Sequence, residues 1–216
     1  VVHQTVGSDF HHLNLENSGA KTTSFSLDVE GNITIGGSAA FTPAAATTID
    51  IAGNWSNWGT AGFIEGTSIV DFDGGGDQSI TCTAGDQEFH DVTFTNAGTV
   101  TANPDLDVQN DLTISGAAIL APGAGRTIDI GRNWLNYSTV GFTEGTSIVD
   151  FDGGAGQTLT TTSGSEYFYD VSFSNAGTTV TDCILWVEND LSISGNALLD
   201  VDVNDNDIFI SGNWNS

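Results

Sequence analysis

One string of sequence occurs twice in this chain without change, and the offset between its two copies constrains the fold more than any other feature. EGTSIVDFDGG spans Glu65–Gly75 and returns at Glu144–Gly154, an offset of 79 in the numbering. The same offset relates Phe10, Phe89 and Phe168, which open the strings FHHLNL, FHDVTF and FYDVSF. Several separate motifs that share one period indicate a repeat architecture, in which each unit packs mainly on its neighbours.

Within each period a short strand motif recurs, in which an Asp stands between two apolar or aromatic residues. It occurs eight times in order, and its last residues are 22, 21, 20, 16, 22, 21 and 20 positions apart. These last residues are Val29, Ile51, Phe72, Val92, Val108, Ile130, Phe151 and Val171. A strand that returns about every 20 residues, with no helical periodicity between, is typical of one coil of a parallel β-solenoid. A β-sandwich also has short strands, but it does not require the same strand chemistry in a fixed order.

The sequence therefore predicts an all-β chain folded as a right-handed parallel β-helix. One coil per motif gives about 12 coils of 16–23 residues, four to each 79-residue period. We expect one domain spanning residues 1–216, with a shortened coil at 1–9 and repeat units at 10–88, 89–167 and 168–216. Strand alternation places the flanking apolar residues inside the coil and the Asp outside. The outward residues should form one column of Asp28, Asp50, Asp71, Asp91, Asp107, Asp129, Asp150 and Asp170.

The repeated motifs are similar to a known family. The strings F-x-D-V-x-F-x-N-A-G-T, N-D-L-x-I-S-G, G-N-W and G-T-x-x-V-x-F-D-G followed by Q-T-L cover essentially the whole chain. Together they resemble a degenerate repeat of about 80 residues in large secreted surface and adhesin-like proteins of bacteria, often Bacteroidota. The resemblance implies a secreted β-solenoid. It brings no catalytic residue with it, because its motifs are structural.

The charge of the chain narrows the choice of partners. Three Lys and Arg residues stand against 28 Asp and Glu residues, which gives a formal net charge of −25. Nucleic acids and anionic membranes both need a basic face, so we expect neither as a partner. No run of about 18 apolar residues occurs, so we expect no membrane insertion. The chain does not begin with Met, which indicates either a removed leader or an internal piece.

The acidic residues are candidate ligands for Ca²⁺. Carboxylates about 5 Å apart on neighbouring coils repel by about 1 kcal/mol per pair even in water, and calcium favours oxygen ligands. The candidates are Asp71 with Asp73, Asp150 with Asp152, and an acidic loop formed by Asp200, Asp202, Asn204, Asp205 and Asp207. The alternative is that these side chains extend into solvent and are screened by salt. The loop lacks the glycine and the final Glu of an EF-hand, so a solvated turn is the alternative there.

Paired carboxylates also occur in glycoside hydrolases, and several β-helix enzymes cleave acidic polysaccharides. Such sites generally need Lys or Arg to hold the uronate, and this chain has only Lys21, Arg126 and Arg132. A catalytic site is normally unique, whereas these Asp residues recur with the coils. We therefore predict that the protein is not an enzyme, and a polysaccharide-degrading β-helix enzyme is the least favoured alternative.

The aromatic residues suggest a different surface. Trp55, Trp134 and Trp214 align with inward leucines of other coils, so we expect them in the core. Trp58 and Tyr137 are equivalent positions that follow polar residues, so we expect both to be exposed in a row. Exposed rings in a row can stack on sugars. A carbohydrate-binding surface module is therefore the alternative function, with glycans as its partners.

The two cysteines are predicted to lie five coils apart, roughly 24 Å along the axis. A disulfide needs Cα atoms within about 7 Å of each other. Cys82 and Cys183 should therefore not pair within one straight solenoid, which leaves free thiols or an intermolecular bridge.

The order of the coils leads to a hypothesis about assembly. Solenoid ends expose unpaired strand edges, and the predicted coil order keeps its phase across a junction between two copies. We predict a structural, extracellular or cell-surface protein that forms a head-to-tail filament with itself or is a segment of a long adhesin-like fibre. The expected interface consists of Val1, Val2, Ile208, Ile210 and Trp214. The competing explanation is a slice of a longer array, which keeps the phase trivially.

Overall fold

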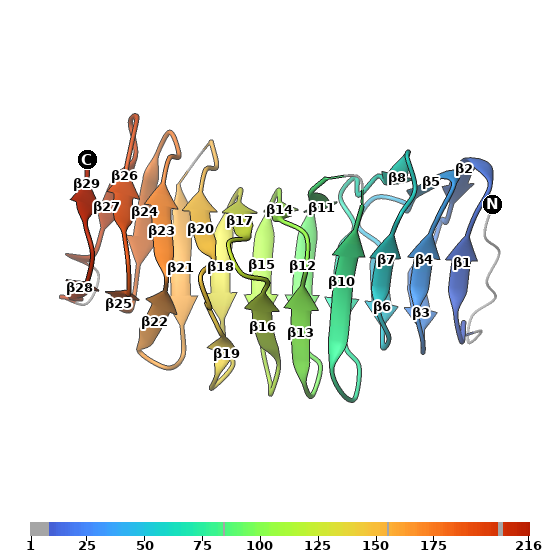
Figure 1. Cartoon of the computed structure of the whole chain (residues 1–216), viewed down its shortest axis with the longest axis horizontal. Helices are drawn as coiled ribbons and strands as arrows, with labels where there is room; N and C mark the ends of the chain where they lie inside the picture. Colours follow the sequence, from blue (N-terminus) through green and yellow to red (C-terminus); the bar gives the residue numbers. More distant parts are fainter. Residues whose placement is uncertain (1–8, 84, 155, 203–204) are drawn as a thin grey trace.

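The structure, a computed structural model, describes residues 9–83, 85–154, 156–202 and 205–216. Its strands form an all-β parallel solenoid of about nine turns, which confirms the predicted fold class. The turns stack into an elongated rod with β1 near one end and β29 at the other (Figure 1). Val1 and Val2 of the predicted interface lie outside the described residues.

Each turn contributes three strands, one to each of three faces that run along the rod. Strands three apart in the chain pair in parallel, as β1 does with β4 and β3 with β6. The first face contains β1 (Leu13–Leu15), β4 (Ile33–Ile35), β7 (Trp55–Asn57), β10 (Gln78–Cys82), β13 (Thr99–Ala102), β16 (Ile119–Pro122), β19 (Gly141–Phe142), β22 (Ser165–Phe168), β25 (Ile184–Val187) and β28 (Ile208–Ile210).

The other two faces are built in the same way. The second face contains β2 (Ser18–Thr22), β5 (Ser38–Thr42), β8 (Gly62–Phe63), β11 (Gln87–Phe89), β14 (Leu106–Val108), β17 (Thr127–Ile130), β20 (Ile148–Phe151), β23 (Asp170–Phe173), β26 (Leu191–Ile193) and β29 (Trp214–Asn215). The third face contains β3 (Leu27–Val29), β6 (Thr48–Ile51), β9 (Ile69–Phe72), β12 (Asp91–Phe94), β15 (Asp111–Ile114), β18 (Asn133–Asn136), β21 (Gln157–Thr161), β24 (Thr178–Thr181) and β27 (Leu198–Asp200).

The sequence repeat and the structural turn do not coincide. The motif Leu-Asp-Val stands in β3 and again, one period later, in β14, which is 11 strands further along the chain. Because three strands make one turn, 11 strands make three and two-thirds turns. Each repeat therefore begins one face away from the previous repeat, and equivalent residues of neighbouring repeats lie on different faces.

The predicted count of about 12 coils, with four to each period, is therefore wrong. The count fails at the shortest spacing between motifs, which separates Val92 from Val108 and is less than a full turn. Val92 pairs with Leu112, so the turn that begins at Val92 ends there. Val108 lies on the second face and pairs with Phe89. The Phe89–Phe94 motif crosses a corner and contributes strands to two faces, so one motif does not correspond to one coil.

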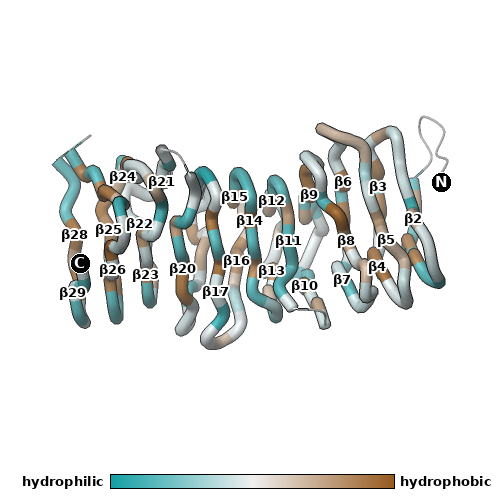
Figure 2. The backbone as a smooth tube through the Cα atoms, turned by 90° about the horizontal axis from the view of Figure 1, so that it is seen from above, coloured by the Kyte–Doolittle hydropathy of each residue, from teal (hydrophilic) through white to brown (hydrophobic). Residues whose placement is uncertain are grey.

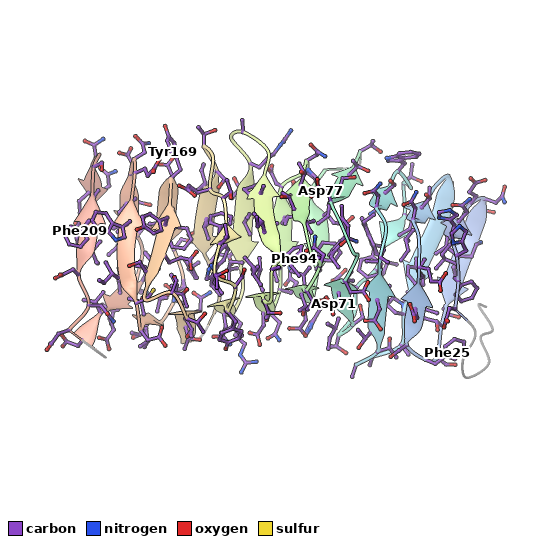
Figure 3. The ribbon with its side chains drawn as sticks, turned by 90° about the horizontal axis from the view of Figure 1, so that it is seen from below. Phe25, Asp71, Asp77, Phe94, Tyr169 and Phe209 are labelled. Carbon is purple, nitrogen blue, oxygen red and sulfur yellow. The ribbon has the colours of Figure 1, made fainter. Side chains whose placement is uncertain are left out.

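The core follows the strand alternation that the sequence predicts. Leu106, Val108 and Leu112 are fully buried, and the Asp between the first two points outward. Phe94 lies inside the rod (Figure 3) and stacks on Phe72 with ring centroids 5.4 Å apart. Hydrophilic and hydrophobic stretches alternate around each turn (Figure 2). The inward side chains form one continuous hydrophobic cluster from β1 to β26.

The corners are fixed by side-chain oxygens that accept hydrogen bonds from the next turn. Asn32 Oδ1 accepts from the Asn54 N–H at 2.9 Å, and Asn54 Oδ1 accepts from the Ser79 N–H at 2.8 Å. Gly53 is required here by close approach, because a Cβ at this position would collide with the Gly31 backbone. The predicted Gly-Asn corners are therefore present, and each of these turns binds the following one at its corner.

Two faces are interrupted once each within the described residues. On the second face β8 and β11 belong to separate sheets, and on the first face β19 and β22 do so. We call these places the β8–β11 junction and the β19–β22 junction. Each is filled by three rings whose centroids lie 4.8–6.0 Å apart. The rings are Trp55, Phe63 and Phe89 at the first and the equivalent Trp134, Phe142 and Phe168 at the second.

Candidate functional site

The eight Asp residues do not form one column, so that prediction is wrong. Asp28, Asp50 and Asp71 are in register on β3, β6 and β9, and the next strand of the third face brings Thr93 into line. Asp91, which was expected to continue the column, pairs with Ile69 instead. We call Asp28, Asp50 and Asp71 the first acidic ladder.

An equivalent set lies on the second face. Asp107, Asp129 and Asp150 are in register on β14, β17 and β20, and we call them the second acidic ladder. Glu88 precedes this ladder and Ser172 follows it. The two ladders occupy different faces because the repeat advances by a non-integral number of turns.

The central carboxyl group of each ladder has a raised pKa. Burial raises the pKa of Asp50 to about 6, and the carboxylates of Asp71, Asp73 and Asp28 add to the rise. Burial likewise raises the pKa of Asp129 to about 6, with Asp152 as the largest electrostatic contributor. Like charges one strand apart disfavour the ionised form, and partial desolvation acts in the same direction. The ladders are therefore electrostatically strained at neutral pH.

A hydroxyl group donates a hydrogen bond to the last carboxylate of each ladder. Thr95 Oγ1 donates to Asp71 Oδ1 at 2.9 Å, and the equivalent Ser174 Oγ donates to Asp150 Oδ1 at 3.0 Å. Burial raises the pKa of Asp71, and the hydrogen bond from Thr95 opposes that rise.

Asp91 and Asp170 have a structural task that the sequence interpretation missed. Asp91 Oδ1 accepts from Asn110 Nδ2 at 2.6 Å and from the backbone N–H of Asp111 at 3.1 Å. Asp170 Oδ1 accepts from Asn189 Nδ2 at 2.7 Å and from the Asp190 N–H at 2.8 Å. These carboxylates accept hydrogen bonds from the next turn at a corner, as the asparagines of other turns do. The signal was the N-D dipeptide that follows each of them one turn later in the sequence.

The predicted cation ligands are not gathered into one centre. No group of three or more His, Cys, Asp and Glu side chains in the described part of the chain is arranged to hold a metal ion. Asp73 and Asp152 lie close enough to Asp50 and Asp129 to raise the pKa of each. Calcium binding therefore stays a prediction that rests on the charge of the ladders.

The acidic loop follows β27. Asp202 donates its backbone N–H to Asp200 Oδ1 at 3.0 Å, and Asp205 has a left-handed backbone with φ of 52°. Asp202, Asp205 and Asp207 are all exposed. Asn204 lies outside the described residues.

The predicted row of sugar-binding rings is also divided. Trp58 and Tyr137 are exposed as predicted, at 55% and 45%. Trp58 follows β7 on the first face, whereas Tyr137 follows β18 on the third face, so the two rings do not share a row. Trp55 and Trp134 are buried as predicted. Trp214 is exposed, contrary to the prediction, because β29 is the last strand of its sheet and is paired on one side only.

An aromatic ladder on the first face was not predicted. Tyr167, Trp186 and Phe209 are in register on β22, β25 and β28 and are exposed by 38–47%. Their rings stack nearly parallel, with centroid separations of 6.0 Å and 4.2 Å. The ladder ends near the end of the rod, at Phe209 (Figure 3).

The aromatic ladder takes the place of a third acidic ladder. Tyr167 and Trp186 stand one period after Glu88 and Asp107, and Phe209 stands one period and one further position after Asp129. Alignment of the repeats would therefore have revealed this exchange. Because neighbouring rings cover both faces of Trp186, its ring offers edges rather than a face to solvent. Sugars stack on ring faces, so the centre of this ladder is poorly suited to them.

The two junctions place buried polar side chains next to aromatic rings. At the β8–β11 junction, Gln87 Oε1 accepts from Trp55 Nε1 at 2.9 Å and from Asn57 Nδ2 at 3.1 Å. Gln87 Nε2 donates to the Glu88 carbonyl oxygen at 2.9 Å. A small cavity of about 150 Å³ opens beside this junction, lined in part by Asn57, Cys82 and Gln87.

Glu166 stands at the position of Gln87 in the β19–β22 junction. Asn136 Nδ2 donates to Glu166 Oε1 at 3.1 Å and to Oε2 at 3.0 Å. The residue is only 2% exposed. Burial raises its pKa to about 7, and the hydrogen bonds from Asn136 oppose the rise.

The two thiols are free, in agreement with the prediction that they cannot pair. Cys82 is half-buried, and Cys183 is buried. Burial raises the pKa of the Cys183 thiol to about 12. This thiol is therefore protonated at neutral pH and is a poor nucleophile.

Of the predicted assembly residues, Ile208 and Ile210 lie half-buried in β28, and Trp214 is exposed in β29. All three lie in the last turn of the rod (Figure 1).

Comparisons of the chain with family models, curated proteins and solved structures found no match in any of the three. A search of the described residues for a helix long and apolar enough to cross a membrane found none.

Proposed function

We propose that this chain is a secreted structural protein of a cell surface, which forms a rigid segment of a head-to-tail filament or of a long adhesin-like fibre. The proposal rests on one observation. The 79-residue unit recurs with the same strand pairing, the same kind of junction and an equivalent acidic ladder. The second copy of each feature lies on a different face of the rod from the first. Such a unit extends the rod without changing its cross-section, which suits a structural fibre.

The contacts between turns support an extendable rod. Asp190 Oδ1 accepts from the Asn213 N–H at 2.8 Å, just as Asn32 accepts from the turn after it. Both bonds run from the side chain of one turn to the backbone of the next. With a strand spacing of about 4.8 Å, the nine turns give a rod of about 43 Å.

The surface charge supports end-to-end rather than lateral contacts. The net charge of −25 and the two acidic ladders make the sides of two rods repel each other. In the last turn, Ile208, Ile210 and Trp214 provide apolar surface that a second copy could cover.

The assembly is tested by sedimentation and electron microscopy of the purified chain over a range of concentrations. We expect species that lengthen with concentration while keeping the width of one rod, and we expect Ile210→Asp to shorten them. Trp58→Ala, which changes an exposed ring away from the last turn, is the matched control. A monodisperse species of 22.5 kDa at high concentration, with no fibres, would refute head-to-tail stacking.

A carbohydrate-binding module is the second candidate function. The exposed ring of Trp58 on the first face favours it, because an isolated exposed indole can stack on a sugar. Retention on a glycan array that is lost in Trp58→Ala would support this function. Equal retention of the variant and the wild type would exclude Trp58 as the binding ring.

A further inference from the structure

The β8–β11 and β19–β22 junctions are two copies of one arrangement with a single chemical difference at their centre. Trp55 and Asn57 of the first correspond to Trp134 and Asn136 of the second, and Gln87 corresponds to Glu166. Gln87 has an oxygen that accepts two hydrogen bonds and an NH₂ group that donates to a backbone carbonyl. A protonated carboxylic acid also offers both an acceptor and a donor, whereas a carboxylate offers acceptors only. The β8–β11 junction is therefore built around a neutral side chain, and protonation gives Glu166 the same neutral charge at the equivalent position.

We propose that Glu166 is a protonation-controlled latch: the β19–β22 junction is closed while Glu166 is protonated and opens when Glu166 ionises. This inference does not depend on the proposed function.

The groups that face Glu166 offer an ionised carboxylate hydrogen bonds, which oppose the rise of its pKa, but no positive charge. They are the Asn136 amide and Trp134 indole from β18, the Thr161 hydroxyl from β21 and the Cys183 thiol, all neutral at pH 7, together with the carboxylate of Glu144. No ion pair in the described chain involves Glu166, because Arg126 and Arg132 lie beside Asp105 and Asp111. An unpaired buried carboxylate is costly and is relieved by protonation or by exposure to water.

β22 is the strand that opening of the junction would release. β22 is an edge strand that pairs only with β25 among the described strands, and its other edge faces the junction. Opening can therefore free this strand without breaking the sheets of the other two faces. Tyr167, the next residue, is the first ring of the aromatic ladder, so an open junction would expose a strand edge beside that ring.

The size of the effect follows from proton linkage. The carboxyl has a pKa of about 7 when closed and an ordinary value of 4.5 when exposed. The closed state then loses stability as pH rises from 4.5 to 7, and the loss levels off above 7. The opening equilibrium should increase about 70-fold between pH 5 and pH 8.

Hydrogen exchange followed by mass spectrometry tests the latch, with the other junction as a control inside the same molecule. Peptides covering residues 165–169 and 86–90 are compared from pH 5 to pH 8, and their ratio cancels the intrinsic pH dependence of exchange. We expect the ratio to rise about 70-fold in the wild type, as linkage requires, and to stay flat in Glu166→Gln. In Gln87→Glu, the exchange of residues 86–90 should acquire the same pH dependence. A ratio independent of pH in the wild type would overturn the proposal, and so would a rise that persists in Glu166→Gln.

Discussion

Replacing Asp50 by Asn should stabilise this protein at neutral pH. Asp50 is the central residue of the first acidic ladder, with Asp28 on one side and Asp71 on the other. Asn has nearly the same shape but carries no charge, so Asp50→Asn removes both like-charge contacts and leaves the strand pairing unchanged. No hydrogen bond from a described side chain depends on the Asp50 carboxylate.

The magnitude follows from the pKa of Asp50, which burial and its neighbours raise from 3.8 to about 6. Because this pKa is higher in the folded state, the fold is fully stabilised below pH 3.8 and loses stability as pH rises through 6. The full shift corresponds to about 3 kcal/mol. Asp50 is only half-buried, so solvent screening reduces the usable part to about 1 kcal/mol. At pH 7 the variant should melt about 2–4 °C higher than the wild type.

Thermal unfolding at pH 7 and pH 3.5, at fixed ionic strength, measures this difference. The gain should be present at pH 7 and absent at pH 3.5. Asp129→Asn, the equivalent change in the second acidic ladder, should behave in the same way. Glu16→Gln removes one exposed charge outside both ladders and is the control for net charge. An equal gain from Glu16→Gln, or no gain from Asp50→Asn at pH 7, would refute the reasoning.

Three further predictions concern cations, the aromatic ladder and the core. Millimolar Ca²⁺ should raise the melting temperature relative to chelator at matched ionic strength, by mass action on the native state; identical midpoints would contradict this. Trp186→Asp introduces the acidic residue found at the equivalent position of the second repeat. It should lower the free energy of unfolding, measured in urea, by about 1–3 kcal/mol because two stacked contacts are lost. Trp58→Ala, which removes an exposed ring that is not stacked, should lower it by less. Phe94→Ala should cost about 3–5 kcal/mol through the cavity left in the core, whereas the outward Thr93→Ala should cost far less.

The parallel solenoid could be predicted from the sequence because strand alternation and the 79-residue period report on local geometry. Leu106 and Val108 are inside and Asp107 is outside because the side chains of a strand alternate, and no tertiary information is needed for that. That Cys82 and Cys183 do not pair with each other followed from the same reasoning, because distant turns cannot bring two sulfur atoms together.

The alignment of residues between turns could not be predicted, because it depends on which strand pairs with which. The motif around Asp91 has the same pattern as that around Asp71, yet it is displaced along the strand, so that Thr93 rather than Asp91 continues the ladder. The buried position of Glu166 was hidden for a related reason. It stands in a strand of polar and aromatic residues, and only the three-dimensional structure shows which side of that strand faces the core.

The mismatch between repeat and turn has an electrostatic consequence for the whole rod. A unit of 12 strands would fill four whole turns and place the carboxylate run of every repeat on the same face, one run after another along the rod. The unit of 11 strands instead moves the next run to another face. The first run has three carboxylates, the second has four when Glu88 is included, and each run ends at a hydroxyl donor, Thr95 or Ser174. Repulsion between unit charges falls with distance and is screened within about 10 Å by salt. Ladders on separate faces therefore destabilise the fold independently, and the electrostatic cost of one ladder is not raised by the ladder of the next repeat.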